Sequence, residues 1–272
     1  MTRALVIYNH FMHSPQAKFH KQHHKHRNIL EKQDFPLYPV VTAILVDGGF
    51  YRRQAFHLFG DKTPQQRADE LVSYCYRHIK NSSAFLYRIF YYDCPPSEKV
   101  LYHPLLKKQI NLGKSSQYQW TKDFFNELIH RRKVALRRGE ELETQHGYTL
   151  AHEPLKKLLS GKIQISDLTE SDFKLDITQK GVDMRLGLDI ASLATGGQVN
   201  QIVMISGDSD FVPAAKLARK SGIDFVLDPM WANISHSLSE HVDGVVSVVK
   251  NHPDCKQDPL HIDNLKDQTA PL

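Results

Sequence analysis

Cysteine is scarce in this sequence, with only Cys75, Cys94 and Cys255 among 272 residues. The three lie far apart and form no CxxC pair, which argues against a structural zinc site or a disulfide framework. Long hydrophobic runs are also missing, because the longest, such as VVTAILV, are much shorter than the ~20 residues that cross a bilayer. The first residues hold no hydrophobic core of the secretory type. We therefore expect a cytoplasmic protein without a membrane partner.

Most of the chain has no strong excess of positive or negative side chains. Residues 1–40 hold six Lys or Arg against two Asp or Glu, and so carry four of the five net positive charges. The remainder is balanced, with 29 basic against 28 acidic side chains. Affinity for an acidic partner must therefore come from local patches. An apolar fraction of 41% supports a folded core of one large or two small domains.

Composition divides the chain into three parts. Residues 1–39 form a basic, His-rich arm, with histidines at positions 20, 23, 24 and 26 interspersed with lysines. This composition indicates a solvated, flexible segment that could contact nucleic acid nonspecifically, with a metal-binding tract as the alternative. Residues 251–272, which hold three prolines, are expected to be an unstructured tail. The folded domain is then residues 40–250.

The middle part alternates between strand and helix patterns. Thr63, followed by Pro64 and Gln66, is typical of a helix start. Residues 146–176 show no clear pattern. The alternation favours an α/β fold with a doubly wound, mostly parallel, Rossmann-like sheet and helices on both faces. The expected strands are 40–46, 85–92, 134–142, 202–205, 223–227 and 245–249, and the expected helices are 63–81, 118–132, 183–195, 211–220 and 235–241.

Two of these apolar strands end in turns rich in acid and glycine. Val40–Val46 is followed by Asp47 and two glycines, and the strand in QIVMISGDSDF leads to Asp208 and Asp210. If the two strands are parallel neighbours, their carboxyl ends meet at one edge of the sheet, where ligands of such folds bind. Asp183 opens a helix before the second strand and adds a carboxylate. Such a cluster of hard oxygen donors suits Mg²⁺ or Mn²⁺.

Some of these acids also have a structural interpretation. Asp183 and Asp210 are both placed to cap a helix, whereas Asp208 has no such alternative role. Asp189 follows Asp183 by six residues and therefore faces another side of the same helix. The side chains expected to support the site from behind are Asp93, Asp189, Ser206 and Ser209.

Three cations near the acid turns are expected to contact substrate phosphates. Arg52 and Arg53 follow the first turn closely, and Lys180 lies just before Asp183. Alternatively, these three side chains are ordinary solvated charges on the surface. A second basic cluster at residues 131–138 could extend a nucleic-acid groove, or could equally be ordinary charged surface beside three glutamates.

The ordered motifs VDGG, YYDCPP, KGVD and SGDSDF resemble the NYN domain of the PIN-like nuclease superfamily, most closely its LabA-like branch. The resemblance covers Val40–Val249. Members often carry an asparagine three residues after the first acid, where this sequence has Phe50, so one polar contact is absent. The resemblance implies that the metal-binding acids are Asp47, Asp183 and Asp208, with Asp210 as a fourth.

The resemblance implies a divalent-metal-dependent nuclease, most simply an endoribonuclease acting on RNA, with DNA as a second possible substrate. Bound Mg²⁺ or Mn²⁺ would activate water and stabilise the leaving oxygen. The main alternative is a noncatalytic RNA-binding member of the same fold, which would bind RNA without Mg²⁺ and cleave nothing. A glycosyltransferase would leave Asp47 and Asp183 without a role. An aspartyl-phosphate phosphatase normally needs two acids separated by one residue, where this chain has Asp47 followed by two glycines.

Overall fold

The structure is a computed structural model that describes residues 39–140, 142–143, 147–176 and 178–249. The predicted arm, apart from Pro39, and the predicted tail lie outside the described residues. Within the described part of the chain, no helix is both long and apolar enough to cross a membrane.

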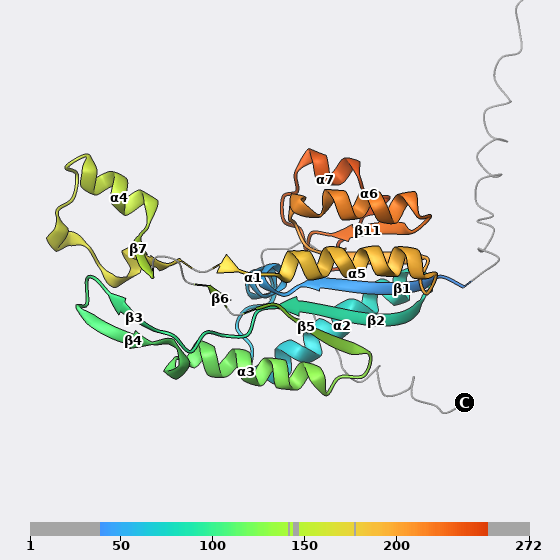
Figure 1. Cartoon of the computed structure of the whole chain (residues 1–272), viewed down its shortest axis with the longest axis horizontal. Coiled ribbons are helices and arrows are strands. Elements are labelled where there is room, and N and C mark those ends of the chain that lie inside the picture. Colours follow the sequence, from blue (N-terminus) through green and yellow to red (C-terminus); the bar gives the residue numbers. More distant parts are fainter. Residues whose placement is uncertain (1–38, 141, 144–146, 177, 250–272) are drawn as a thin grey trace, which may run out of the picture. The chain divides into compact units, whose positions relative to one another are not determined.

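A six-stranded sheet forms the centre of the described domain, and all of its neighbouring strands pair in parallel (Figure 1). The strand order is β12-β11-β10-β1-β2-β5, so the first strand lies in the middle of the sheet. The predicted doubly wound α/β fold is confirmed. The strands are β1 (Val41–Asp47), β2 (Phe85–Asp93), β5 (Val134–Arg138), β10 (Gln201–Ile205), β11 (Asp224–Asp228) and β12 (Gly244–Val245).

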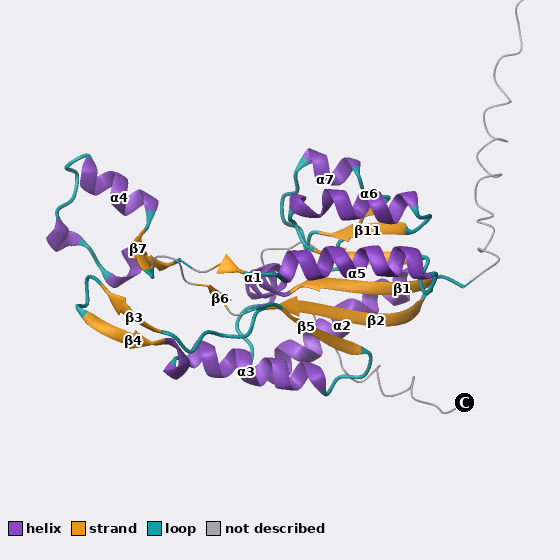
Figure 2. Cartoon of the chain, in the orientation of Figure 1, coloured by secondary structure: helices purple, strands orange, loops and turns teal. Residues whose placement is uncertain are grey.

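Helices cover both faces of this sheet (Figure 2). Side chains of a strand point alternately to its two faces. Ile44 and Val46 of β1 accordingly pack with the first three helices, while Ala43 and Leu45 pack with the later ones. The first group is α1 (Gly48–Phe59), α2 (Pro64–Ser82) and α3 (Ser116–Ile129), and the second is α5 (Val182–Gly196), α6 (Val212–Lys220) and α7 (His236–Glu240).

Helix α1 was not among the expected helices, because its first two residues are glycines, which are typical of a turn. The start of α2 is as expected, since the Thr63 hydroxyl accepts from the backbone N–H of Gln66 and the Gln66 side chain accepts from that of Thr63. Helix α5 differs from expectation at its start. Its cap is Gly181, with φ of 78°, and Asp183 lies in the first turn without capping it.

Shorter elements follow β2 and β5 along the chain and begin at the carboxyl ends of these strands. A hairpin of β3 and β4 follows β2, and two further antiparallel pairs precede α5. The buried ring of His103 in the hairpin packs against Tyr148 and Phe173, which joins these segments. The elements are β3 (Val100–His103), β4 (Lys108–Asn111), β6 (Leu142–Glu143), β7 (Tyr148–Leu150), α4 (His152–Leu159), β8 (Phe173–Leu175) and β9 (Thr178–Gln179), with short 3₁₀ helices at Leu112–Lys114, Ile165–Asp167, Glu170–Asp172 and Ser209–Phe211.

Candidate functional site

The carboxyl ends of β1 and β10 meet at the point where the strand order reverses. These two strands are hydrogen-bonded neighbours, with Val46 opposite Ile205. The chain leaves β1 toward one face of the sheet and β10 toward the other, which opens the crevice where ligands of such folds bind. A pocket of about 1070 Å³ lies there, and its lining includes Asp47, Asp183 and Asp208. The tertiary structure thus brings three predicted site acids to one pocket.

Asp47 is the last residue of β1 and also caps helix α1. Its Oδ1 accepts a hydrogen bond from the backbone N–H of Phe50 at 3.0 Å, and its Oδ2 accepts one from the Ser206 hydroxyl at 3.2 Å. Burial raises the pKa of Asp47, while these two hydrogen bonds and the positive charge of Arg53 lower it in part. Asp47 therefore combines a structural role with a position in the lining of the pocket.

Ser206 joins the two acid turns. It is fully buried, and its hydroxyl accepts from the backbone N–H of Asp208 at 3.2 Å while donating to Asp47. Asp208 in turn accepts from the backbone N–H of Asp210 at 2.9 Å and caps the short helix Ser209–Phe211. The capping role considered for Asp210 therefore belongs to Asp208, for which no structural role was expected. Ser209 and Asp210 are exposed in this turn.

Asp183 enters the pocket from the other face of the sheet, in the first turn of α5. Desolvation raises its pKa, and the negative charges of Asp47, Asp208 and Asp210 raise the pKa further. Four carboxylates therefore act on one another electrostatically at this edge. Mutual repulsion of this kind is relieved when a cation binds between the charges.

The chemistry of these donors fits a divalent cation, since all are hard carboxylate oxygens. Among the residues that the structure describes, however, no group of three or more His, Cys, Asp or Glu side chains is arranged to hold a metal ion. Holding one ion therefore requires Asp183 and Asp208 to approach Asp47 more closely than they lie here.

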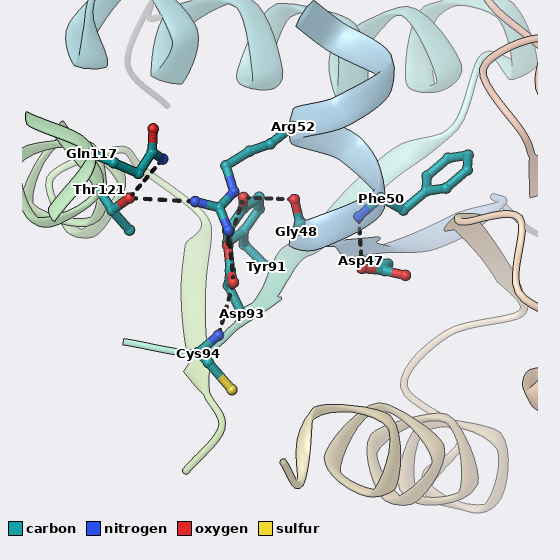
Figure 3. Close-up of polar contacts among 9 residues, drawn as sticks. All are labelled: Asp47, Gly48, Phe50, Arg52, Tyr91, Asp93, Cys94, Gln117 and Thr121. Atoms are coloured by element: carbon teal, nitrogen blue, oxygen red, sulfur yellow. Dashed lines mark hydrogen bonds and ion pairs between the residues drawn. The ribbon is translucent and has the colours of Figure 1, made fainter. Parts of the chain in front are cut away.

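Arg52 and Asp93 form a buried ion pair behind this edge (Figure 3). Arg52 Nη2 lies 3.0 Å from Asp93 Oδ2, and Arg52 Nη1 donates to Thr121 at 3.4 Å. Asp93 also accepts from the backbone N–H of Cys94 at 2.8 Å and from the Tyr91 hydroxyl at 3.3 Å. Burial raises the pKa of Asp93 to about 6 despite these partners. Arg52 thus links α1 to β2 and α3 while it also lines the pocket, and its phosphate contact stays a prediction.

Asp189, which was expected to support the site from behind, contacts side chains of β2 and β5. Its Oδ2 accepts from the Tyr92 hydroxyl at 2.8 Å and pairs with Arg137 Nε at 3.0 Å, so it ties α5 to β2 and β5. It is not among the residues that line the pocket. Lys180 does not line it either, whereas Arg52 and Arg53 do. Of these two arginines, Arg53 is exposed, while Arg52 is partly buried and paired with Asp93.

The pocket also has an aromatic wall that sequence reasoning missed. Phe56 is 56% exposed and lines the pocket with His57 from α1, while Tyr118 and Trp120 come from α3. Phe56 and His57 were overlooked because helix α1 was not expected, whereas Tyr118 and Trp120 lie on the helix expected at 118–132. Phe50 also lines the pocket, where the family often has asparagine. Its ring lies against the second acid turn, since a Cβ added to Gly207 would come within 2.9 Å of it.

A comparison with protein-family models bears directly on this edge of the sheet. Residues 117–248 match the model of the NYN domain. The predicted NYN domain is thereby confirmed. The NYN domain belongs to the PIN-like nuclease superfamily, and the narrower LabA-like branch stays a prediction. The NYN match includes Asp183, Asp208 and Asp210 but begins after Asp47, although β1 pairs directly with β10 inside the matched segment.

No curated protein matches the chain. Among solved structures, a protein of unknown function from Vibrio parahaemolyticus is similar at 12% identity, with a TM-score of 0.42 over 79% of this chain and 97% of that one. A structure concerned with the mechanism and regulation of Sir2 enzymes is similar at 11% identity, with a TM-score of 0.26 over 76% of this chain and 86% of that one. At these scores neither likeness carries an argument.

Proposed function

We propose that this chain is a divalent-metal-dependent endoribonuclease, which hydrolyses RNA at the pocket of Asp47, Asp183 and Asp208. One observation carries the proposal: β1, α5 and the turn after β10 each contribute a carboxylate to one pocket. The NYN match supports a nuclease-like function related to RNA. Mg²⁺ or Mn²⁺ is the expected cofactor.

The acids that would hold the metal are Asp47, Asp183 and Asp208, with Asp210 beside them. When bound, the metal would activate water, bind a phosphate oxygen and stabilise the leaving oxygen. Ser206 fixes the direction of the Asp47 carboxylate and also holds the turn of Asp208. These hydrogen bonds link the two acid turns that would supply metal ligands.

Other side chains of the same pocket suit a nucleic-acid strand. Arg53 is exposed beside Asp47 and can pair with a backbone phosphate. Phe56 presents an exposed ring on which a base can stack, which contributes about 1–3 kcal/mol per base in such sites. A single strand can use both contacts at once because its bases are not paired.

The proposal is tested with the purified full chain and labelled single-stranded RNA, structured RNA and DNA. Each substrate is incubated with Mg²⁺, Mn²⁺ or EDTA. We expect cleavage of RNA that requires metal and falls at least 100-fold in Asp183→Asn and Asp208→Asn. The matched control is Asp189→Asn, since Asp189 lies on the same helix as Asp183 but outside the pocket. Cutting that persists equally in the Asp183 and Asp208 variants contradicts the proposal.

A noncatalytic RNA-binding protein is the second candidate, and two observations favour it. The described carboxylates do not form a ready metal group, and Phe50 replaces a polar contact common in the family. This candidate predicts RNA binding that is the same in Mg²⁺ and EDTA, with no cleavage in either. Binding and cleavage measured on the same RNA therefore separate the two functions.

A further inference from the structure

A second pocket adjoins the acid pocket and is lined mainly by basic and aromatic side chains. Its volume is about 540 Å³. The two pockets share Pro96, Ser97 and Tyr118, so the lining of one continues into the other. Tyr118 therefore stands at their boundary. The other lining residues of this basic pocket are Pro95, Glu98, Lys99, Lys122, Phe125 and Arg138.

Two of its cations lie over aromatic rings. Lys122 Nζ is 6.0 Å from the centre of the Tyr118 ring, and the Arg138 guanidinium carbon is 5.8 Å from that of Phe125. Such contacts hold a cation in place without neutralising it. The single acid of the lining, Glu98, accepts a hydrogen bond from the Tyr118 hydroxyl. The basic pocket therefore has a positive balance, and two of its three cations lie over aromatic rings.

Arg138 differs in this respect from its neighbours in the basic cluster at residues 131–138. Arg131 pairs with acids of α2 and α3, and Arg137 pairs with Asp189. Lys133 donates to the backbone carbonyl of Leu86. Arg138 is exposed, lines the basic pocket and forms no ion pair with any residue in the described ranges. The structure thus divides the cluster into structural pairs and two exposed cations, Arg132 and Arg138, of which Arg138 lines the basic pocket.

We propose that the basic pocket binds a backbone phosphate of the RNA strand whose cleaved linkage lies in the acid pocket. This inference rests on the proposed function and adds the path of the substrate, from Asp208 past Tyr118 to Lys122 and Arg138. A phosphate is favoured over a base, because cations lie over the two rings that a base would otherwise use. Phosphate contacts position a strand without reading its sequence.

The test measures binding of a fluorescent 12-nucleotide RNA in EDTA, where no cleavage interferes. A series of these RNAs carries one neutral methylphosphonate linkage at successive positions. The protein is compared with Lys122→Gln/Arg138→Gln, and Arg138→Lys serves as the conservative variant. The matched control is Arg88→Gln/Lys220→Gln, which removes two exposed cations that line neither pocket.

We expect the pocket variant to lower the slope of log affinity against log salt by ~0.7, the value for the loss of one single-strand phosphate contact. One or two methylphosphonate positions should weaken binding to the unchanged protein but not to the pocket variant. Arg138→Lys should retain most of the salt slope. In the control variant, methylphosphonates at these positions should weaken binding as they do in the unchanged protein. The loss of two positive charges should lower its affinity for every RNA of the series alike.

If the effects of the methylphosphonate and of the pocket substitutions simply add at every linkage, the inference is overturned. A complete absence of RNA binding would overturn it too. An acidic peptide that binds the basic pocket while RNA does not would identify a protein partner instead. If metal-dependent cleavage occurs without position-specific coupling, the proposed function stands and this inference fails. If coupling occurs without cleavage, the basic pocket is confirmed and the nuclease proposal fails.

Discussion

Replacing Ser206 with alanine tests the link between the two acid turns. The Ser206 hydroxyl is fully buried, donates to Asp47 at 3.2 Å and accepts from the backbone N–H of Asp208 at 3.2 Å. Ser206→Ala removes both bonds and leaves no other protein group in their place. A hydrogen bond to a charged group contributes about 1.5–3 kcal/mol, so we expect a loss of that size in the free energy of unfolding at neutral pH.

The loss should depend on pH in a defined direction. The Ser206 hydrogen bond lowers the pKa of Asp47, so its removal raises that pKa further. A protonated carboxyl accepts a weaker hydrogen bond than a carboxylate. The difference in stability between Ser206→Ala and the unchanged protein should therefore be largest above the pKa of Asp47 and shrink as the pH falls. Metal-dependent activity of the variant should need a higher pH, because a metal ligand must be deprotonated.

The assay is urea unfolding at several pH values, together with the pH profile of RNA cleavage. Ser209→Ala is the matched control, because Ser209 lies in the same turn but is exposed. We expect Ser209→Ala to change stability by less than about 0.5 kcal/mol, as is usual for surface substitutions. Equal effects of the two substitutions, or a pH profile that does not move in Ser206→Ala, would refute this reasoning.

Three further predictions follow from the same geometry. Gly48→Ala would place a Cβ 2.6 Å from two atoms of β2. The melting temperature of this variant should therefore fall by an amount that reflects about 1–3 kcal/mol of overpacking. In Gly187→Ala the added Cβ meets nothing within 4 Å, so this control should be neutral or stabilising. The pKa of Asp93 is raised to about 6, so its contribution to stability is present at low pH and is lost as the pH rises through about 6; Asp93→Asn should remove this part of the pH dependence in unfolding titrations. Mg²⁺ at 100 times its dissociation constant should stabilise the fold by about 2.7 kcal/mol in thermal unfolding, and this gain should vanish in Asp183→Asn but persist in Asp189→Asn.

Much of the sheet could be predicted because buried parallel strands are nearly continuous apolar runs. Val41–Asp47 and Gln201–Ile205 are such runs, and both lead into acid turns. The strand expected at 134–142 ends at Arg138, and the one expected at 245–249 is reduced to Gly244–Val245. Helix α1 was missed because two glycines at its start are typical of a turn rather than a helix.

The partners of the charged side chains could not be predicted. Arg52 and Asp93 are 41 residues apart, and their pairing depends on α1 lying beside the end of β2. Asp189 meets Arg137 only because α5 crosses β5. Single acids and cations look alike in a sequence, whether they bind a ligand or another side chain.

The sequence alone determined the parallel α/β fold and the set of acids at its strand ends, because an apolar run and the turn after it are local features. The tertiary structure decided which charges face the pocket. Asp47, Asp183, Asp208, Arg52 and Arg53 line it, whereas Asp189 is held in an ion pair outside it. The physical reason is that burial makes each charge take the partner nearest in space, and the packing of distant elements sets that distance.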